Sequence, residues 1–222
     1  MNGEVSACLG ATDIIRLGGA ELEGFVAQAV KGAEGAEEKV KALFLAVRDG
    51  IVYDPFVASF SPENYYPENI IKAGRGYCVM KAVLLCAALR KAGIPARLGF
   101  ADLRIHTTTK EMREMLGCDI FAWHGFTEVF LDGEWRKATP SFHADLCRKR
   151  NISPLVFDAK SHSIFPPLDL SGKPFASYIR YIGSFTDLPL DLIMKGWRKV
   201  YTDERVDMWM DVFRAGANPP SP

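Results

Sequence analysis

The stretch Gly74-Arg75-Gly76-Tyr77-Cys78-Val79-Met80-Lys81-Ala82 decides the fold, because a turn marked by glycines runs here directly into an apolar helix. From residue 78 to residue 92 all but three residues are apolar, and most are good helix formers. Gly93 and Pro95 then supply a helix stop. A helix that is apolar on nearly all sides is buried. We therefore expect residues 78–92 to form the central helix of the protein.

Cys78 lies in the first turn of this helix and is a candidate nucleophile. Gly74 and Gly76 allow a sharp backbone turn and the close approach of another group. The positive end of the helix dipole and the nearby backbone N–H groups favour the thiolate. The alternative is that Cys78 is an inert core residue, because free cysteines are often buried. Its position in the sequence leaves both interpretations open.

Composition indicates one globular domain over residues 1–222. Hydrophobic residues make up 48% of the 222 residues, which is enough for a substantial core. Basic and acidic residues number 27 each, so the formal net charge is zero and nucleic acid is not an expected partner. The longest wholly apolar run, residues 82–89, is too short to cross a membrane, and residues 1–20 do not resemble a signal peptide. We expect a cytoplasmic protein with no membrane partner.

The cysteines and histidines show no metal pattern. The five cysteines are an odd number and include no C-x-x-C pair, which argues against a disulfide framework and a structural zinc site. His106, His143 and His162 have no acidic partner at metal-ligand spacing, so we expect them on the surface or in loops. No D-x-[DN]-x-[DN]-G calcium loop is present. The sequence therefore indicates no metal and no other cofactor.

A β-hairpin is predicted over residues 120–139. Residues 120–131 are rich in aromatic and β-branched side chains, and Asp132-Gly133 is a strong two-residue turn signal. Residues 134–139 form the returning strand, which Pro140 ends.

The hairpin carries His124. With the turn at residues 132 and 133, the numbers of paired residues sum to 265, so His124 faces Ser141 and Phe126 faces Thr139. Thr139 is then a diagonal neighbour of His124. A lone histidine in a strand is more often structural than catalytic. The cysteine at a helix start makes a catalytic pair the competing interpretation.

Further elements are expected on both sides of this core. Apolar spacing predicts helices at residues 21–30 and 37–48, a short extended segment at 51–55, and a strand at 96–103. Thr108 and Glu111 are spaced as a capping box for a short helix closed by Gly117, and this helix could lie over a site.

The region from residue 143 to residue 222 is expected to form a C-terminal extension packed on the core. Residues 178–182 form a buried segment in this interpretation. A helix from Asp187 follows, with apolar residues at helical spacing, and then a second short helix around Trp209. The extension could shape one wall of the site.

Five short phrases occur in a characteristic order along the chain. They are Val52-Tyr53, Gly74-Arg75-Gly76-Tyr77-Cys78 with Lys81-Ala82, Leu89-Arg90-Lys91-Ala92-Gly93-Ile94-Pro95-Ala96-Arg97, Trp123-His124-Gly125-Phe126-Thr127-Glu128-Val129-Phe130-Leu131, and Asp132-Gly133-Glu134-Trp135. Together they resemble the transglutaminase-like superfamily of papain-fold cysteine enzymes over about residues 37–142. The resemblance implies an α+β fold in which a central buried helix packs on an antiparallel sheet, with extra helices at the C-terminus.

The resemblance also implies a catalytic triad of cysteine, histidine and aspartate. Carried onto this sequence, the nucleophile is Cys78, the base is His124, and the residue that orients the base is at position 139. This chain has Thr139 there instead of aspartate. A hydroxyl can fix the tautomer of the imidazole but stabilises the imidazolium only weakly. Cysteine tolerates such a loss better than serine, because a Cys–His pair can rest as thiolate and imidazolium.

The function implied is cysteine-dependent amide or acyl chemistry through a thioester acyl-enzyme, as in a peptidase, amidase or acyltransferase. The substrate would be a peptide or protein amide, or a small amide or ester. Tyr53, Tyr77 and Trp123 are the candidate substrate-binding residues, although core packing explains the tyrosines equally well. The missing aspartate supports a different class, a non-catalytic peptide-binding or protein-binding module that keeps the cleft. A third alternative is a scaffold in which Cys78 is structural.

Overall fold

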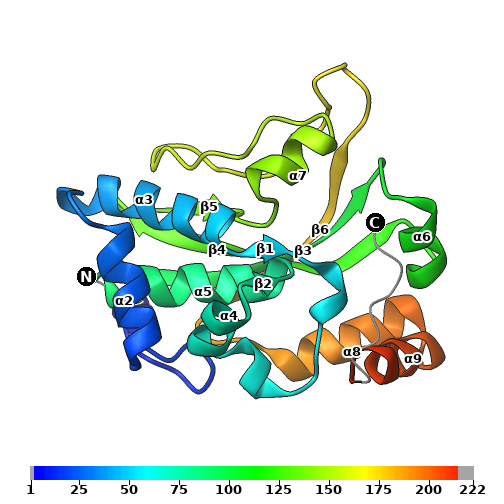
Figure 1. The fold of residues 1–222 in the computed structure, drawn as a ribbon, viewed down its shortest axis with the longest axis horizontal. Helices are drawn as coiled ribbons and strands as arrows, with labels where there is room; N and C mark the ends of the chain where they lie inside the picture. The colour runs from blue at the N-terminus through cyan, green and yellow to red at the C-terminus, as the bar shows by residue number, and fades with distance from the viewer. Residues whose placement is uncertain (1–2, 215–222) are drawn as a thin grey trace.

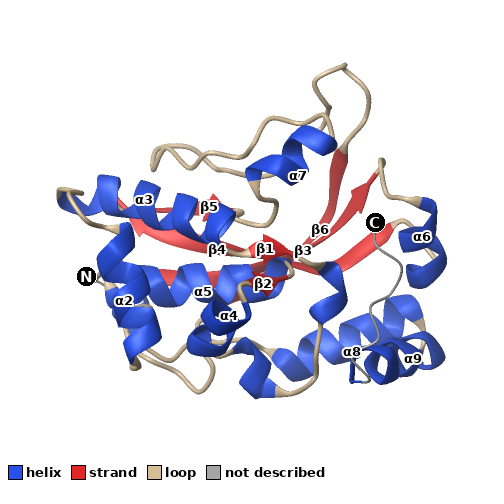
Figure 2. Ribbon diagram, viewed as in Figure 1, coloured by secondary structure: helices blue, strands red, loops and turns tan. Residues whose placement is uncertain are grey.

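The computed structural model describes residues 3–214, and the helix α5 (Cys78–Lys91) lies at its centre. This helix is buried along nearly its whole length, as its apolar sequence predicts. It packs on a four-stranded antiparallel sheet with the strand order β5-β4-β3-β6 (Figures 1 and 2). The strands are β3 (Ala96–Ile105), β4 (Ile120–Leu131), β5 (Glu134–Ala138) and β6 (Ala176–Phe185). The predicted α+β fold is therefore correct.

The N-terminal half of the chain surrounds the rest of α5. Helices α2 (Ala20–Ala29), α3 (Gly35–Gly50) and α4 (Pro67–Ala73) all contact it, and α1 (Gly3–Ala7) precedes them. Strand β1 (Val52–Tyr53) pairs in parallel with β2 (Arg75–Gly76), which leads directly into Cys78. The connection between β1 and α4 contains two 3-10 turns, η1 (Pro55–Val57) and η2 (Pro62–Tyr65).

The hairpin of β4 and β5 has the predicted register only as far as Ala138. The pairs run from Leu131 with Glu134 to Thr127 with Ala138, which keeps the sum of 265. Beyond this point the prediction is wrong, because the backbone N–H of Thr139 donates instead to the carbonyl of Ser163 at 2.9 Å. Proline has no N–H to continue a ladder, so the chain leaves β4 at residue 140. His124 and Ser141 are consequently not a ladder pair.

The short helix α6 (Lys110–Leu116) forms as predicted but starts one residue later than its expected cap. Thr109, rather than Thr108, caps the helix by accepting a hydrogen bond from the backbone N–H of Met112 at 3.3 Å. The Thr108 hydroxyl is buried and donates to the carbonyl of Ile105 at 2.5 Å. Gly117 closes the helix in the left-handed conformation, as expected.

The C-terminal region contributes three helices and the last strand of the sheet. In the view of Figure 1, α7 (Ala144–Lys149) lies above the strands, and α8 (Leu190–Tyr201) and α9 (Asp203–Arg214) lie below them. The predicted burial of residues 178–182 is wrong, because β6 is an edge strand that pairs only with β3. Ile179 and Tyr181 each remain 49% exposed.

The helix α8 is fastened to the start of β4 by hydrogen bonds from side chains. The Tyr201 hydroxyl accepts from the backbone N–H of Ala122 at 2.7 Å and donates to the carbonyl of Ile120 at 3.0 Å. The Trp197 indole N–H donates to the carbonyl of Ala122 at 3.1 Å. These contacts place the C-terminal helices beside the strand that carries His124.

None of the helices within residues 3–214 is long and apolar enough to cross a bilayer. The five cysteines all lie within this range and are free thiols.

Candidate active site

Cys78 and His124 line the same cavity, which has a volume of about 290 Å³. Cys78 comes from the first turn of α5, and His124 comes from the middle of β4. Tyr53 at the end of β1 also lines this cavity. The fold thus brings together three residues that are 25 to 71 positions apart in the sequence.

The Cys78 thiol is mostly enclosed, and burial dominates its acidity. Burial raises the pKa of Cys78 to about 11, although the backbone N–H groups of Gly125, Val79 and Cys78 itself oppose part of this rise. The neutral thiol is therefore the favoured form in the resting protein. The N–H groups act in the expected direction, but desolvation of the charged sulfur outweighs them.

His124 is buried and has an unpartnered ring nitrogen. Its side chain is 5% exposed, and its ring lies 5.5 Å from the ring of Phe165 and 6.4 Å from that of Tyr178, measured between centroids. Nε2 is buried without a hydrogen-bond partner. Burial lowers the pKa of His124 to about 3, because no neighbouring carboxylate offsets the loss of solvation. The resting pair is thus a neutral thiol and a neutral imidazole.

Thr139 is fully buried and forms no hydrogen bond to His124. The Thr139 and Ser141 hydroxyl oxygens are both buried without a hydrogen-bond partner, as is the Nε2 atom of His124. Thr139 also lies close enough to Tyr178 to oppose part of the rise in the pKa of that phenol, which burial raises to about 12. Thr139 and His124 are thus both neighbours of Tyr178, but Thr139 does not form the direct hydrogen bond that an orienting residue would make.

The predicted substrate-binding residues divide between two cavities. Tyr53 lines both the larger cavity and a smaller one of about 70 Å³, whereas Tyr77 and Trp123 line only the smaller one. Cys78 and His124 line both cavities, so the pair stands where the two meet. The C-terminal helices supply one wall of the smaller cavity through Trp197, Tyr201 and Trp209.

Tyr77 and Trp123, the two predicted substrate-binding residues that line only the smaller cavity, are held by specific contacts. The Tyr77 hydroxyl lies 2.8 Å from the hydroxyl of Tyr65, within hydrogen-bonding distance. Trp123 has a positive φ of 58°, and its backbone N–H donates to the buried carboxylate of Asp102 at 3.0 Å. Asp102 in turn accepts two hydrogen bonds from the Arg180 guanidinium, at 2.7 and 3.1 Å. This chain of contacts fixes the backbone immediately before His124.

Sequence reasoning missed His143, which also lines the larger cavity. It lies in the loop that leads into α7, as expected for a surface or loop residue, and its Nδ1 accepts a hydrogen bond from the backbone N–H of Tyr53 at 3.2 Å. The contact joins residues 90 positions apart and depends on how α7 packs, so no local sequence pattern signals it. Leu146, Lys149 and Arg150 reach the cavity in the same way.

No group of three or more His, Cys, Asp or Glu side chains that could hold a metal ion occurs within residues 3–214.

Comparison with known proteins gives one family. The sequence model of the transglutaminase-like superfamily matches residues 23–140, which is more than half of the chain. No curated protein matches the chain significantly in sequence.

Two solved structures are similar at low identity. A proposed cysteine protease from Cytophaga hutchinsonii is 17% identical, with a TM-score of 0.49, over 83% of this chain and 54% of that one. A proposed protease from Parabacteroides distasonis is 16% identical, with a TM-score of 0.41, over 64% of this chain and 27% of that one. This chain thus spans about half the length of the first protein and about a quarter of the second. On the match over residues 23–140, the chain belongs to the transglutaminase-like superfamily.

Proposed function

We propose that the protein carries out thiol-dependent amide or acyl chemistry, as a peptidase, amidase or acyltransferase, with Cys78 as nucleophile and His124 as base. The observation that supports this most is that both side chains line one cavity, while backbone N–H groups lie near the thiol. The membership of the superfamily agrees with this proposal.

The chemistry begins from a neutral pair. A ring nitrogen of His124 takes the proton of the Cys78 thiol as the sulfur attacks the substrate carbonyl. The backbone N–H groups of Cys78 and Val79 stabilise the developing oxyanion at the helix start. The carbon–nitrogen or carbon–oxygen bond then breaks, the leaving group takes the proton from His124, and a thioester remains on Cys78. Water or an amine attacks the thioester with His124 again acting as base, which restores the thiol.

Thr139 takes the third position of the triad in this proposal. Because its hydroxyl carries no charge, it stabilises an imidazolium less than a carboxylate would. The site then works as a Cys–His dyad, and Tyr53, Tyr77 and Trp123 bind the substrate around it.

Trapping of the acyl-enzyme tests the proposal. The protein is mixed with activated acyl esters at neutral pH, and the acyl group is located by intact-mass and peptide mass spectrometry. We expect a thioester on Cys78 that is absent from Cys78→Ala and strongly reduced in His124→Ala. Cys118→Ala is the matched control, because Cys118 is also partly exposed but lies outside both cavities. Equal labelling of His124→Ala and wild type would contradict the proposal.

A non-catalytic peptide-binding or protein-binding module is the second candidate. Two observations favour it: the hydroxyl of Thr139 replaces a carboxylate, and Nε2 of His124 has no partner. In that case peptides bind the cavity with equal affinity in wild type and in Cys78→Ser, and no acyl-enzyme forms with any ester.

A further inference from the structure

One face of the helix α7 is turned toward the larger cavity. His143 at the helix start, Leu146 and Lys149 are spaced three residues apart, and Arg150 follows immediately; all four line the cavity. This spacing places side chains on one side of a helix. Arg148, which lies between them in sequence, does not line the cavity and instead pairs with Asp145. The position of α7 therefore brings Lys149 and Arg150 to the cavity and leaves Arg148 outside it.

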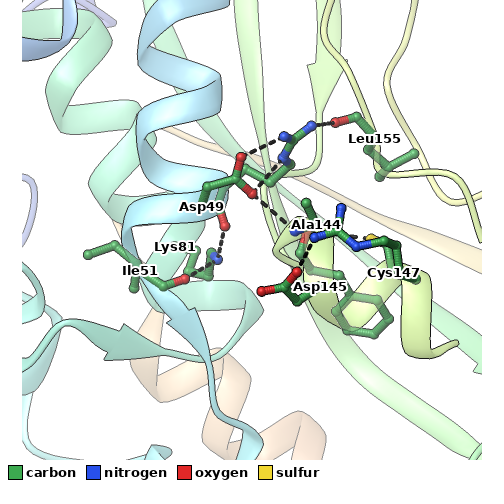
Figure 3. Close-up of polar contacts among 10 residues, drawn as sticks. Asp49, Ile51, Lys81, Ala144, Asp145, Cys147 and Leu155 are labelled. Carbon is green, nitrogen blue, oxygen red and sulfur yellow. Dashed lines mark hydrogen bonds and ion pairs between the residues drawn. The ribbon is translucent and has the colours of Figure 1, made fainter.

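A polar network holds this helix in place (Figure 3). The backbone N–H of Ala144 donates to the carboxylate of Asp49 at 3.0 Å. Asp49 also accepts two hydrogen bonds from Arg48, at 2.6 and 3.0 Å. Arg48 in turn donates to the carbonyl of Leu155, which follows α7, at 2.6 Å. Because α3 anchors both ends of the α7 region, the backbone that carries Lys149 and Arg150 is fixed beside the cavity.

The charges of the cavity do not neutralise one another. Within residues 3–214, Lys149 forms no ion pair, and Arg150 donates one N–H to the carbonyl of Thr107 at 3.0 Å, which leaves its other N–H groups for a ligand. Glu111 is the one carboxylate among the lining residues, and neither Lys149 nor Arg150 pairs with it. The lining therefore carries a net charge of about one positive unit when His143 is neutral.

His143 adds a neutral hydrogen-bond donor. Since its Nδ1 accepts from the backbone N–H of Tyr53, the proton of the neutral ring is on Nε2. Burial lowers the pKa of His143, and protonated Lys81 acts in the same direction, so the ring is neutral at pH 7. The cavity thus has one N–H donor of fixed tautomer in addition to the two cations.

Most of the remaining wall of the cavity is apolar. Its aromatic and aliphatic side chains include Val52, Phe56, Met112, Phe121, Phe142 and Phe165, while Tyr53, Thr108 and Thr109 add hydroxyl groups. A volume of about 290 Å³ is at the small end of the range for ligand pockets. A cavity of this volume can hold one apolar group of a small ligand, but it is too small for a peptide segment of several residues.

We propose that the substrate of Cys78 is a small acyl compound with an apolar body and a terminal carboxylate. The apolar body fills the larger cavity, and the carboxylate binds Lys149 and Arg150 at α7, with Nε2–H of His143 as a further donor. This inference rests on the proposed function for the acyl transfer itself, but the recognition of the carboxylate is a separate property that can be measured without turnover.

A binding experiment with matched ligands tests this recognition. The probes are 4-phenylbutyrate and its primary amide, which have the same apolar body and differ in charge, and binding is measured by isothermal titration calorimetry. We expect wild type to bind the carboxylate at least about tenfold more tightly than the amide, the difference expected from one charge-assisted contact that is partly screened. The double variant Lys149→Gln with Arg150→Gln should bind both probes equally. Arg148→Gln is the matched control and should keep the full preference.

A second variant removes the Glu111 carboxylate, the negative charge that lines the cavity. Glu111→Gln should tighten binding of 4-phenylbutyrate and leave the amide unchanged, because it removes a like charge from the cavity. The inference is overturned if wild type binds both probes equally, if neither binds at up to about 10 mM, or if the preference survives in the double variant. Charge-dependent binding without any acyl-enzyme would instead keep this inference and contradict the proposed function. Acyl-enzyme formation from charged and neutral esters at equal rates would support the proposed function and contradict the recognition of a carboxylate.

Discussion

Gly125 of β4 lies directly against Val79 of α5, with no room for a side chain between them. A Cβ atom added to Gly125 would lie 3.0 Å from the Cα of Val79 and 3.1 Å from its Cγ2. This contact brings the backbone next to His124 up to the first turn of the helix that carries Cys78. The same approach places the N–H of Gly125 near the Cys78 thiol.

Gly125→Ala should therefore move the part of β4 that carries His124 away from the start of α5, which carries Cys78. The added methyl group has to push β4 away from backbone atoms of α5, which we expect to cost about 1–3 kcal/mol in the free energy of unfolding. The rate of acylation of Cys78 should fall more than stability alone explains, because the N–H of Gly125 moves away from the sulfur. Chemical denaturation and single-turnover acylation measure the two effects. An unchanged acylation rate in a folded variant would contradict this role of the contact.

Gly196 in α8 predicts a second close approach. A Cβ atom there would lie 1.7 Å from Nε1 of Trp123, so Gly196→Ala has to displace Trp123 from the smaller cavity. We expect a loss of about 1–3 kcal/mol in stability, although alanine normally stabilises a helix relative to glycine. Gly24→Ala in α2 is the control, because nothing lies within 4 Å of its added methyl group. That variant should gain about 0.5–1 kcal/mol in thermal or chemical denaturation.

Equal stability of Gly196→Ala and Gly24→Ala would contradict this close contact, because it would mean that a methyl group fits between α8 and Trp123.

Lys81 gives the protein an alkaline dependence of stability. Its ammonium is fully buried and donates to the carbonyls of Arg48 at 2.8 Å and Ile51 at 2.5 Å, and burial lowers its pKa to about 7 (Figure 3). The unfolded lysine has a pKa near 10.5, so between pH 7 and pH 10.5 the unfolded state binds more protons than the folded state. The unfolding free energy should rise with pH in this window, by up to about 1.4 kcal/mol per pH unit from this residue.

Comparison with Lys81→Met isolates this effect from the cysteines and tyrosines that also titrate at alkaline pH. The difference in unfolding free energy between wild type and Lys81→Met should move in favour of wild type as the pH rises from 7 to 10. Urea denaturation at several pH values measures it. A constant difference would show that Lys81 keeps its ordinary pKa in the folded state.

Thr139→Asp should restore the third member of the triad. A carboxylate at position 139 would raise the pKa of His124 from about 3 and stabilise the imidazolium formed during acylation. We expect at least a tenfold gain in kcat, and the acid limb of the pH profile should move to higher pH. The asparagine of Thr139→Asn has nearly the same shape as the aspartate but no charge. This variant should show neither the gain in kcat nor the shift of the acid limb. Equal behaviour of the two variants would mean that position 139 does not reach His124.

The sequence was sufficient to predict the parts of the fold that depend on local patterns. The apolar run after Cys78 predicted α5 to within one residue, and the Asp132-Gly133 turn predicted the register of β4 and β5 as far as Ala138. Both signals are strong because each is set by residues close together in the chain. The register failed at Thr139, where a distant segment at Ser163 replaces β4 as the hydrogen-bond partner.

The site was less predictable, because its electrostatics depend on enclosure. The helix start favours a thiolate at Cys78, but residues from α6, β4 and the C-terminal helices enclose the thiol, and this burial raises its pKa. His143 gave no signal, since its place is determined by the packing of α7 against α3 and β1. Burial of β6 was overestimated for a similar reason, because an apolar segment does not reveal that it ends a sheet.

The rate of alkylation of Cys78 as a function of pH tests most directly whether Cys78 and His124 act as one unit. Iodoacetamide labelling of Cys78 is followed by mass spectrometry in wild type, in His124→Ala and in the Cys118→Ala control. Without its base, Cys78 should react only as its thiolate, so the rate in His124→Ala should rise about tenfold per pH unit toward the pKa of about 11. We predict that wild type reacts at least about a hundredfold faster than His124→Ala at pH 7, and that this advantage narrows as the pH approaches 11. Identical rates in wild type and His124→Ala at every pH would contradict the catalytic pair.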